Sequence, residues 1–123
     1  MPVAISVAMF GALGAVTRYG VDVLIERHTA TVFPLSTLVI NASGCLLAGA
    51  AVGGLVDRFH EPRWLTVGAV TGYLGDYTTF STFAFETYDL YRGGHLALAA
   101  LDIFASVAFG IAGVYLGLLL VGR

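Results

Sequence analysis

TATVFPLSTLVINASGCLLAGAAVGGLV, residues 29–56, contains no charged side chain. About 20 mostly apolar residues in a helix cross the hydrocarbon core of a bilayer, so this stretch predicts a membrane-spanning helix. The whole chain has the same character, because 58% of its 123 residues are hydrophobic, only 11% are charged, and the mean hydropathy is +0.86. A soluble domain of this size could not cover its surface with so few polar groups. We therefore expect an integral membrane protein.

Three other stretches are apolar and long enough to cross the membrane, although charges interrupt the first two: residues 3–25, 63–91 and 103–122. The segments between them are short, as in connections between neighbouring antiparallel helices. The sequence therefore predicts an all-α, multi-pass protein whose four transmembrane helices form a single domain, residues 1–123. The net charge of -2 and the lack of a basic cluster argue against a nucleic-acid partner.

The orientation of the chain in the membrane depends on its basic residues, which are all arginines. Lysine and arginine in short loops normally mark the cytoplasmic side. In this chain Arg58, Arg63 and Arg123 fall on the side of the N-terminus, while Arg18, Arg27 and Arg92 fall on the other. This balance predicts insertion in both orientations. The alternative is that an N-terminal feature or a partner subunit fixes one of them.

Small and polar residues recur at three- and four-residue spacing, as expected where helices pack closely in lipid. The resulting faces are Gly11, Gly14, Arg18 and Asp22; Thr37, Asn41, Gly44 and Ala48; and Asp102, Ser106, Gly110, Gly113 and Gly117. Asn41 differs from its neighbours, because its amide needs hydrogen-bond partners in a medium without water. It either bonds a neighbouring helix or faces a polar pathway, and its position alone leaves both alternatives open.

GDYTTFSTFAFE, residues 75–86, interrupts the third apolar stretch with a glycine, an aspartate and several hydroxyl side chains. This cluster predicts a helix broken near residues 75–79. Irregular backbone at that depth is tolerated only where it is buried in protein or lines a cavity. After the break, helical rotation places Thr79, Thr82 and Glu86 in a polar track beside an aromatic stripe with Phe80 and Phe83. Alternatively, the phenylalanines pack or face lipid and the hydroxyls bond their own helix.

Three segments resemble the motifs of the CrcB/Fluc fluoride channel family: GALGAVTRY at residues 11–19, FPLSTLVINASG at 33–44 and GDYTTFSTFAFE at 75–86. The resemblance extends over all four predicted spans in order. It implies a dual-topology, antiparallel dimer with fluoride pores at the dimer interface, in the cytoplasmic (inner) membrane of a prokaryote. The implied activity is passive, fluoride-selective efflux that lowers cytoplasmic fluoride, so we do not expect an enzyme.

The same resemblance implies roles for individual residues. Asn41, Phe80, Phe83, Thr37 and Ser106 match pore positions, Arg18 matches the arginine of the first-span motif, and the backbone carbonyls of Gly75 and Thr78 match those that hold a structural sodium ion at the dimer centre. Fluoride binds its water tightly, so a pore must replace that water with hydrogen-bond donors. The Asn41 amide and the Thr79 and Ser106 hydroxyls can donate, and the phenylalanine ring edges carry partial positive charge.

Three residues depart from the family motifs. Asp76 stands where a second glycine is usual, Asp102 where a tyrosine is common, and Ser36 where a glycine is found. A carboxylate beside an anion path repels fluoride unless it is protonated, paired with a cation or turned away. One hypothesis is that Asp76 supplements the sodium site. Another is that a degenerate pathway at Asp102 makes this chain one subunit of a heterodimer with a paralogue, rather than of a homodimer.

Two further alternatives come from other classes of protein. A proton-coupled small multidrug-type transporter would also be a four-helix, dual-topology dimer, and Asp76 or Asp102 would be its exchanging carboxylate. The first span lacks the mid-membrane glutamate of those transporters, and nothing in them explains TTFSTF beside Asn41. The second alternative is an assembly subunit without transport of its own.

Overall fold

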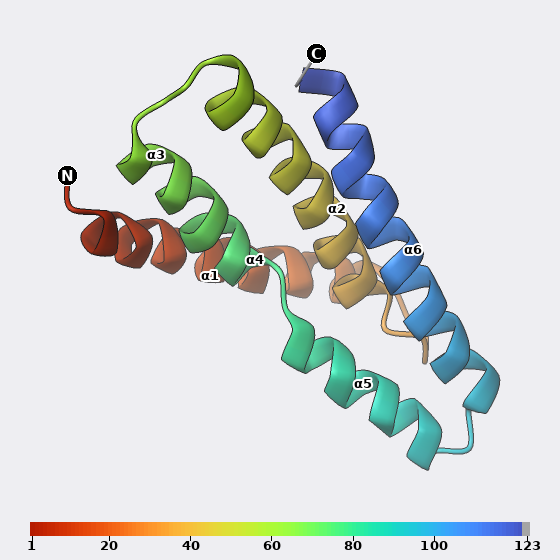
Figure 1. Ribbon diagram of the computed structural model, residues 1–123. Helices are drawn as coiled ribbons and strands as arrows, with labels where there is room; N and C mark the ends of the chain where they lie inside the picture. The colour runs from red at the N-terminus through yellow and green to blue at the C-terminus, as the bar shows by residue number, and fades with distance from the viewer. Residues whose placement is uncertain (122–123) are drawn as a thin grey trace.

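The computed structural model describes residues 1–121, in which every regular element is helical and no strand occurs. The order of elements, shown in Figure 1, is α1 (Val3–His28), α2 (Leu35–Ala51), the π-helical η1 (Val52–Arg58), α3 (Arg63–Val67), the π-helical η2 (Gly68–Leu74), α4 (Gly75–Tyr77), α5 (Phe80–Arg92) and α6 (Leu96–Val121). The expectation of an all-α protein is therefore confirmed for this part of the chain. Gly122 of the predicted fourth span and Arg123 of the arginine count lie outside the described residues.

Three helical segments are long and apolar enough to cross a membrane: Val3–His28, Leu35–Arg58, which joins α2 to η1, and Leu96–Val121. The second begins later than its uncharged run because Pro34 immediately precedes it, and the residue before a proline disfavours helical backbone. The last of these segments corresponds to the predicted fourth span. It begins earlier than predicted, at Leu96, so that Asp102 lies inside the helix. The residues before Asp102 are mostly leucine and alanine, which favour helix strongly.

Helices α2 and α6 lie side by side along most of their length (Figure 1). Glycines allow this close approach, because a methyl group added at Gly49 would collide with the backbone of Val114. A methyl group at Gly117 would similarly collide with the backbone of Leu46 and Ala50. Without a hydrophobic driving force between helices in lipid, such close packing is what holds them together.

Helix α1 packs against η2 and α4 rather than mainly against α2. A side chain at Gly14 would collide with the Tyr73 backbone, so this glycine brings the two segments into contact. The Tyr73 hydroxyl of η2 also donates to Thr17 Oγ1 of α1 at 2.9 Å, and the buried Ser6 hydroxyl of α1 donates to the Trp64 carbonyl of α3. These contacts tie α1 to the segments from α3 to α4.

The helical path between α4 and α5 is interrupted at two residues, Thr78 and Thr79. Both have extended backbone, with φ/ψ of -80°/158° and -145°/117°. Beyond them α5 continues, displaced from α3 and α4 by the extended link, toward the start of α6 (Figure 1). The extended pair therefore places the ends of two helices and several free backbone groups next to α2.

Candidate functional site

A cavity of about 230 Å³ lies where α2 and α6 meet the interruption and the first turn of α5. We call it the central cavity; it is lined by Asn41, Cys45, Thr78, Thr79, Phe80, Phe83, Ser106 and Val107. It brings together five of the residues that the sequence singled out as pore positions, namely Asn41, Thr79, Phe80, Phe83 and Ser106. None of the lining residues carries a formal charge, so the wall of the cavity offers an anion neutral donors.

Thr37 does not line the central cavity. It is buried on α2, one helical turn before Asn41, with 4% of its surface exposed, and it lies next to the Glu86 carboxyl. Cys45, which the sequence did not single out as a pore position, also lines the central cavity. The thiol is half-buried and lies one turn after Asn41, so helical periodicity could have placed it on the same face.

The side chain of Asn41 holds the extended pair in place. Its Nδ2 donates to the Thr79 carbonyl at 2.9 Å, and its Oδ1 accepts from the Thr79 amide at 2.8 Å. The amide therefore bonds a neighbouring segment, which was the first alternative for this residue, and it also lines the central cavity. Only one of its two N–H groups is used by Thr79, which leaves the other for a ligand.

Two carbonyl groups near the interruption lose their ordinary helical donors, and a third accepts from a side chain. In an unbroken helix the Thr79 amide would donate to Gly75, but it donates to Asn41 instead. The Thr82 amide would donate to Thr78, but it donates to Thr79 Oγ1 at 3.2 Å. The Asp76 carbonyl accepts from Arg18 Nε at 3.3 Å. Gly75 and Thr78, the two residues whose carbonyls were predicted to hold a cation, are thus those whose helical donors are diverted by side chains.

The polar track after the interruption is only partly connected. Thr79 caps α5, and its hydroxyl donates to Thr82 Oγ1 at 3.1 Å. Glu86 lies further along, and its Oε1 is a buried atom that has no hydrogen-bond partner within residues 1–121. The rings of Phe80 and Phe83 lie 5.7 Å apart at 57°, and 78% of the Phe80 surface is exposed.

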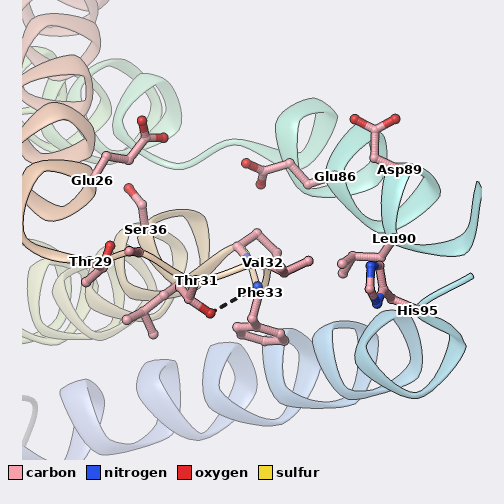
Figure 2. A pocket seen from close by; sticks show the side chains of 13 residues that line it. Glu26, Thr29, Thr31, Val32, Phe33, Ser36, Glu86, Asp89, Leu90 and His95 are labelled. Atoms are coloured by element: carbon pink, nitrogen blue, oxygen red, sulfur yellow. Dashed lines mark hydrogen bonds between the residues drawn. The ribbon is translucent and has the colours of Figure 1, made fainter. Parts of the chain in front are cut away.

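A second and larger cavity, about 430 Å³ in volume, lies between the end of α1, the start of α2 and α5. Its charged and titratable lining residues are Glu26, Glu86, Asp89 and His95 (Figure 2). Ser36, which also lines it, donates to Asp22 Oδ1 at 2.5 Å. This acidic cavity was not predicted, because its members come from three elements whose rotation the sequence does not specify. Its charge favours cations over anions.

Asp102 lies between α5 and α6 with only 1% of its surface exposed. The Ser106 hydroxyl, which also lines the central cavity, is 3.3 Å from Asp102 Oδ1. Thr87 Oγ1 is 2.8 Å from Asp102 Oδ2 and 2.8 Å from the Phe83 carbonyl. The sequence marked Asp102 as a departure but did not predict Thr87 as its partner, since that contact depends on the angle at which α5 meets α6.

Asp76 is exposed, and its carboxylate would touch a side chain added at Gly11 of α1. Within residues 1–121 no group of three or more histidine, cysteine, aspartate or glutamate side chains could hold a metal ion. Any cation at the interruption would therefore depend mainly on backbone carbonyls, which are suitable ligands for hard cations.

Comparison with known proteins gives a consistent match over most of the chain. The model of a family described as CrcB-like protein, Camphor Resistance (CrcB), matches residues 5–118. A protein of Solibacter usitatus (strain Ellin6076) named Fluoride-specific ion channel FluC is 36% identical over 117 residues, which cover 95% of this chain and 96% of the relative. Proteins of the same name from Acidobacterium capsulatum and Methylobacterium sp. (strain 4-46) are 42% and 46% identical, covering 95% and 88% of this chain and 94% and 87% of the relatives.

Proposed function

Because the chain belongs to the CrcB-like family, we propose that it is a fluoride-specific ion channel, which acts by passive conduction and not as an enzyme. The central cavity is the observation that links this proposed function to particular residues. It combines an amide donor, a hydroxyl and an aromatic pair, at Asn41, Ser106, Phe80 and Phe83. Fluoride then leaves the cell down its own electrochemical gradient.

The chemistry of the central cavity suits a small anion that holds its water tightly. The free N–H of Asn41 and the Ser106 hydroxyl replace water as donors, while the ring edges of Phe80 and Phe83 offer weak positive charge. The start of α5 adds backbone N–H groups and the positive end of its helix dipole. Several weak interactions, rather than one strong site, allow the ion both to enter and to leave.

The functional unit that we propose is a dual-topology, antiparallel homodimer of four-span subunits, with the third span broken between α4 and α5. The even distribution of arginines supports insertion in both orientations. Large apolar side chains on α6 are exposed, such as Phe104 and Ile111 at 74% and 68%, which suits contact with lipid or with a second subunit. A heterodimer with a paralogue is the alternative assembly. The membrane is the cytoplasmic (inner) membrane of a prokaryote.

We also propose a structural sodium ion at the dimer centre, held by the carbonyls of Gly75 and Thr78. Their diverted helical donors support this assignment, because each oxygen keeps its lone pairs for a ligand. One chain supplies two such oxygens, fewer than a hard cation normally binds, so the same pair from a second subunit would complete the site. Asp76 adds negative charge beside it.

The proposed activity is tested by measuring anion efflux from liposomes that contain the purified protein alone. We expect rapid fluoride efflux and little chloride efflux, with protein-free liposomes as the control. Replacing Phe80 with isoleucine removes a polarised ring edge and should slow fluoride efflux several-fold. Chloride efflux equal to fluoride efflux, or proton-coupled uptake of organic cations, would contradict the proposal. Fluoride efflux that requires a paralogue would indicate the heterodimer.

Cys45 offers a direct test of whether the central cavity is the conduction path. A small thiol-reactive mercurial bound to its sulfur would occupy part of a cavity of about 230 Å³. We therefore expect the reagent to reduce fluoride efflux several-fold in the wild type and to leave the Cys45→Ala variant unaffected. Full labelling of Cys45, verified by mass spectrometry, with unchanged efflux would show that fluoride follows another route.

A further inference from the structure

Asp102 and its neighbours make three close oxygen–oxygen contacts, but the two neighbouring hydroxyl groups have only two hydrogens to place in them. Three contacts have to be satisfied: Thr87 Oγ1 with the Phe83 carbonyl, Thr87 Oγ1 with Asp102 Oδ2, and Ser106 Oγ with Asp102 Oδ1. A carbonyl oxygen only accepts, and each hydroxyl has one hydrogen to donate. Two hydroxyl hydrogens therefore serve three contacts.

The missing hydrogen has one available source. If Thr87 donates to the Phe83 carbonyl, its oxygen can still accept from Asp102, provided that Oδ2 is protonated. An ionised carboxylate would instead place two oxygens without a hydrogen between them at 2.8 Å, either at Asp102 or at Phe83. The protonated form satisfies all three contacts, with Ser106 donating to the remaining carbonyl oxygen, Oδ1.

The surroundings of Asp102 oppose a negative charge. The side chain is 1% exposed, and ionised side chains are expensive within a membrane unless they are paired. The titratable group that faces it from α5 is Glu86, which is acidic too. The titratable group on α2 is Cys45, which lies beside Gly110, further along α6 than Asp102. Asp57 and Arg58 of η1 lie at the opposite end of α6.

We propose that Asp102 is a neutral carboxylic acid that positions the hydroxyls of Ser106 and Thr87, and so allows this chain to keep an acidic residue beside its anion path. Asp102 does not line the central cavity, so it is a positioning residue. A carbonyl oxygen at 3.3 Å is a weak acceptor, and Ser106 can turn its hydrogen from Oδ1 to a passing fluoride. A carboxylate would hold that hydrogen more strongly, since bonds to ionised acceptors are roughly twice as strong.

The protonation state can be measured without any reference to transport. Infrared spectra of the protein in liposomes at neutral pH should contain the carbonyl stretching band of a protonated carboxyl group, and the Asp102→Asn variant should lack it. In Thr87→Val the acid loses its acceptor, so the band should remain but shift to higher frequency. A wild-type spectrum identical in this region to that of Asp102→Asn would overturn the proposal.

The positioning role, which rests on the proposed fluoride conduction, is tested by comparing two variants of similar size. Asparagine retains both contacts, because its Nδ2 can donate to Thr87 and its Oδ1 can accept from Ser106. Leucine retains neither. We expect Asp102→Asn to conduct fluoride about tenfold or more faster than Asp102→Leu, as the loss of buried hydrogen bonds would give. Equal conduction by the two folded variants would contradict the positioning role.

The two readouts separate the inference from the function on which it rests. A wild type that shows the carboxyl band but conducts no fluoride would refute the proposed function and leave the protonation of Asp102 established. A wild type that conducts fluoride without the band would refute the inference alone. If Asp102→Leu does not fold, the comparison of the wild-type and Asp102→Asn spectra still decides whether the acid is neutral.

Discussion

Replacing Asn41 with alanine is expected to lower fluoride efflux by roughly ten- to a hundredfold, the effect of losing a hydrogen bond to a charged ligand worth about 1.5–3 kcal/mol. The amide lines the central cavity with one N–H free, so alanine removes the donor directly. It also removes both contacts to the Thr79 backbone, at 2.9 and 2.8 Å. Efflux from liposomes containing equal amounts of folded protein measures the change.

The same substitution should weaken the response of the protein to sodium. Without Asn41, the Thr79 amide is free to donate to the Gly75 carbonyl as in an ordinary helix, which withdraws a proposed sodium ligand. We therefore expect sodium to raise the melting temperature of the wild type in detergent and to raise that of Asn41→Ala much less. An equal sodium effect in both proteins would show that Asn41 does not control the Gly75 carbonyl.

Asn41→Asp separates the two effects. Aspartate loses the donor to the Thr79 carbonyl but keeps an oxygen that can accept from the Thr79 amide. The Gly75 carbonyl therefore stays available, and sodium should still stabilise the variant. It also adds a carboxylate to a cavity that otherwise has no formal charge, and fluoride efflux should fall at least as far as in Asn41→Ala. Rapid efflux by Asn41→Asp would place the fluoride path away from residue 41.

The sequence was sufficient to predict the class of fold because lipid imposes strict conditions. Backbone groups in a bilayer must be bonded within the segment, so an uncharged run such as residues 29–56 has few alternatives to a helix. The helix ends were less accurate. Helix α2 begins later than predicted because Pro34 precedes it. Helix α6 begins before Asp102 rather than after it, since the Asp102 carboxyl group finds partners within the protein.

The resemblance to family motifs named Asn41, Phe80, Phe83 and Ser106 as pore positions, and the structure places these four around one cavity. It did not predict their contacts. Their bonding depends on how α5 rotates after two extended residues, and no local pattern encodes that rotation. The contact of Thr87 with Asp102 and the assembly of the acidic cavity were unpredictable for the same reason.

Replacing Gly117 with alanine is expected to destabilise the protein by about 1–3 kcal/mol, the usual effect of extra volume in a packed interior. The added methyl group would collide with the backbone of Leu46 and Ala50, and backbone atoms cannot move aside as a flexible side chain can. Helices α2 and α6 would have to separate, which would also displace Asn41 from Ser106 across the central cavity. Thermal unfolding in detergent, followed by size-exclusion chromatography, measures the loss.

Gly110→Ala is the matched control, because it makes the same chemical change on the same face of α6. A methyl group there would lie 3.5 Å from the Cys45 sulfur, which is an ordinary van der Waals contact. Since alanine is better than glycine in a helix by up to about 1 kcal/mol, this variant should be as stable as the wild type or more so. The two substitutions thus have opposite expected signs, and a Gly117→Ala protein as stable as Gly110→Ala would mean that close contact of α2 with α6 does not hold the subunit together.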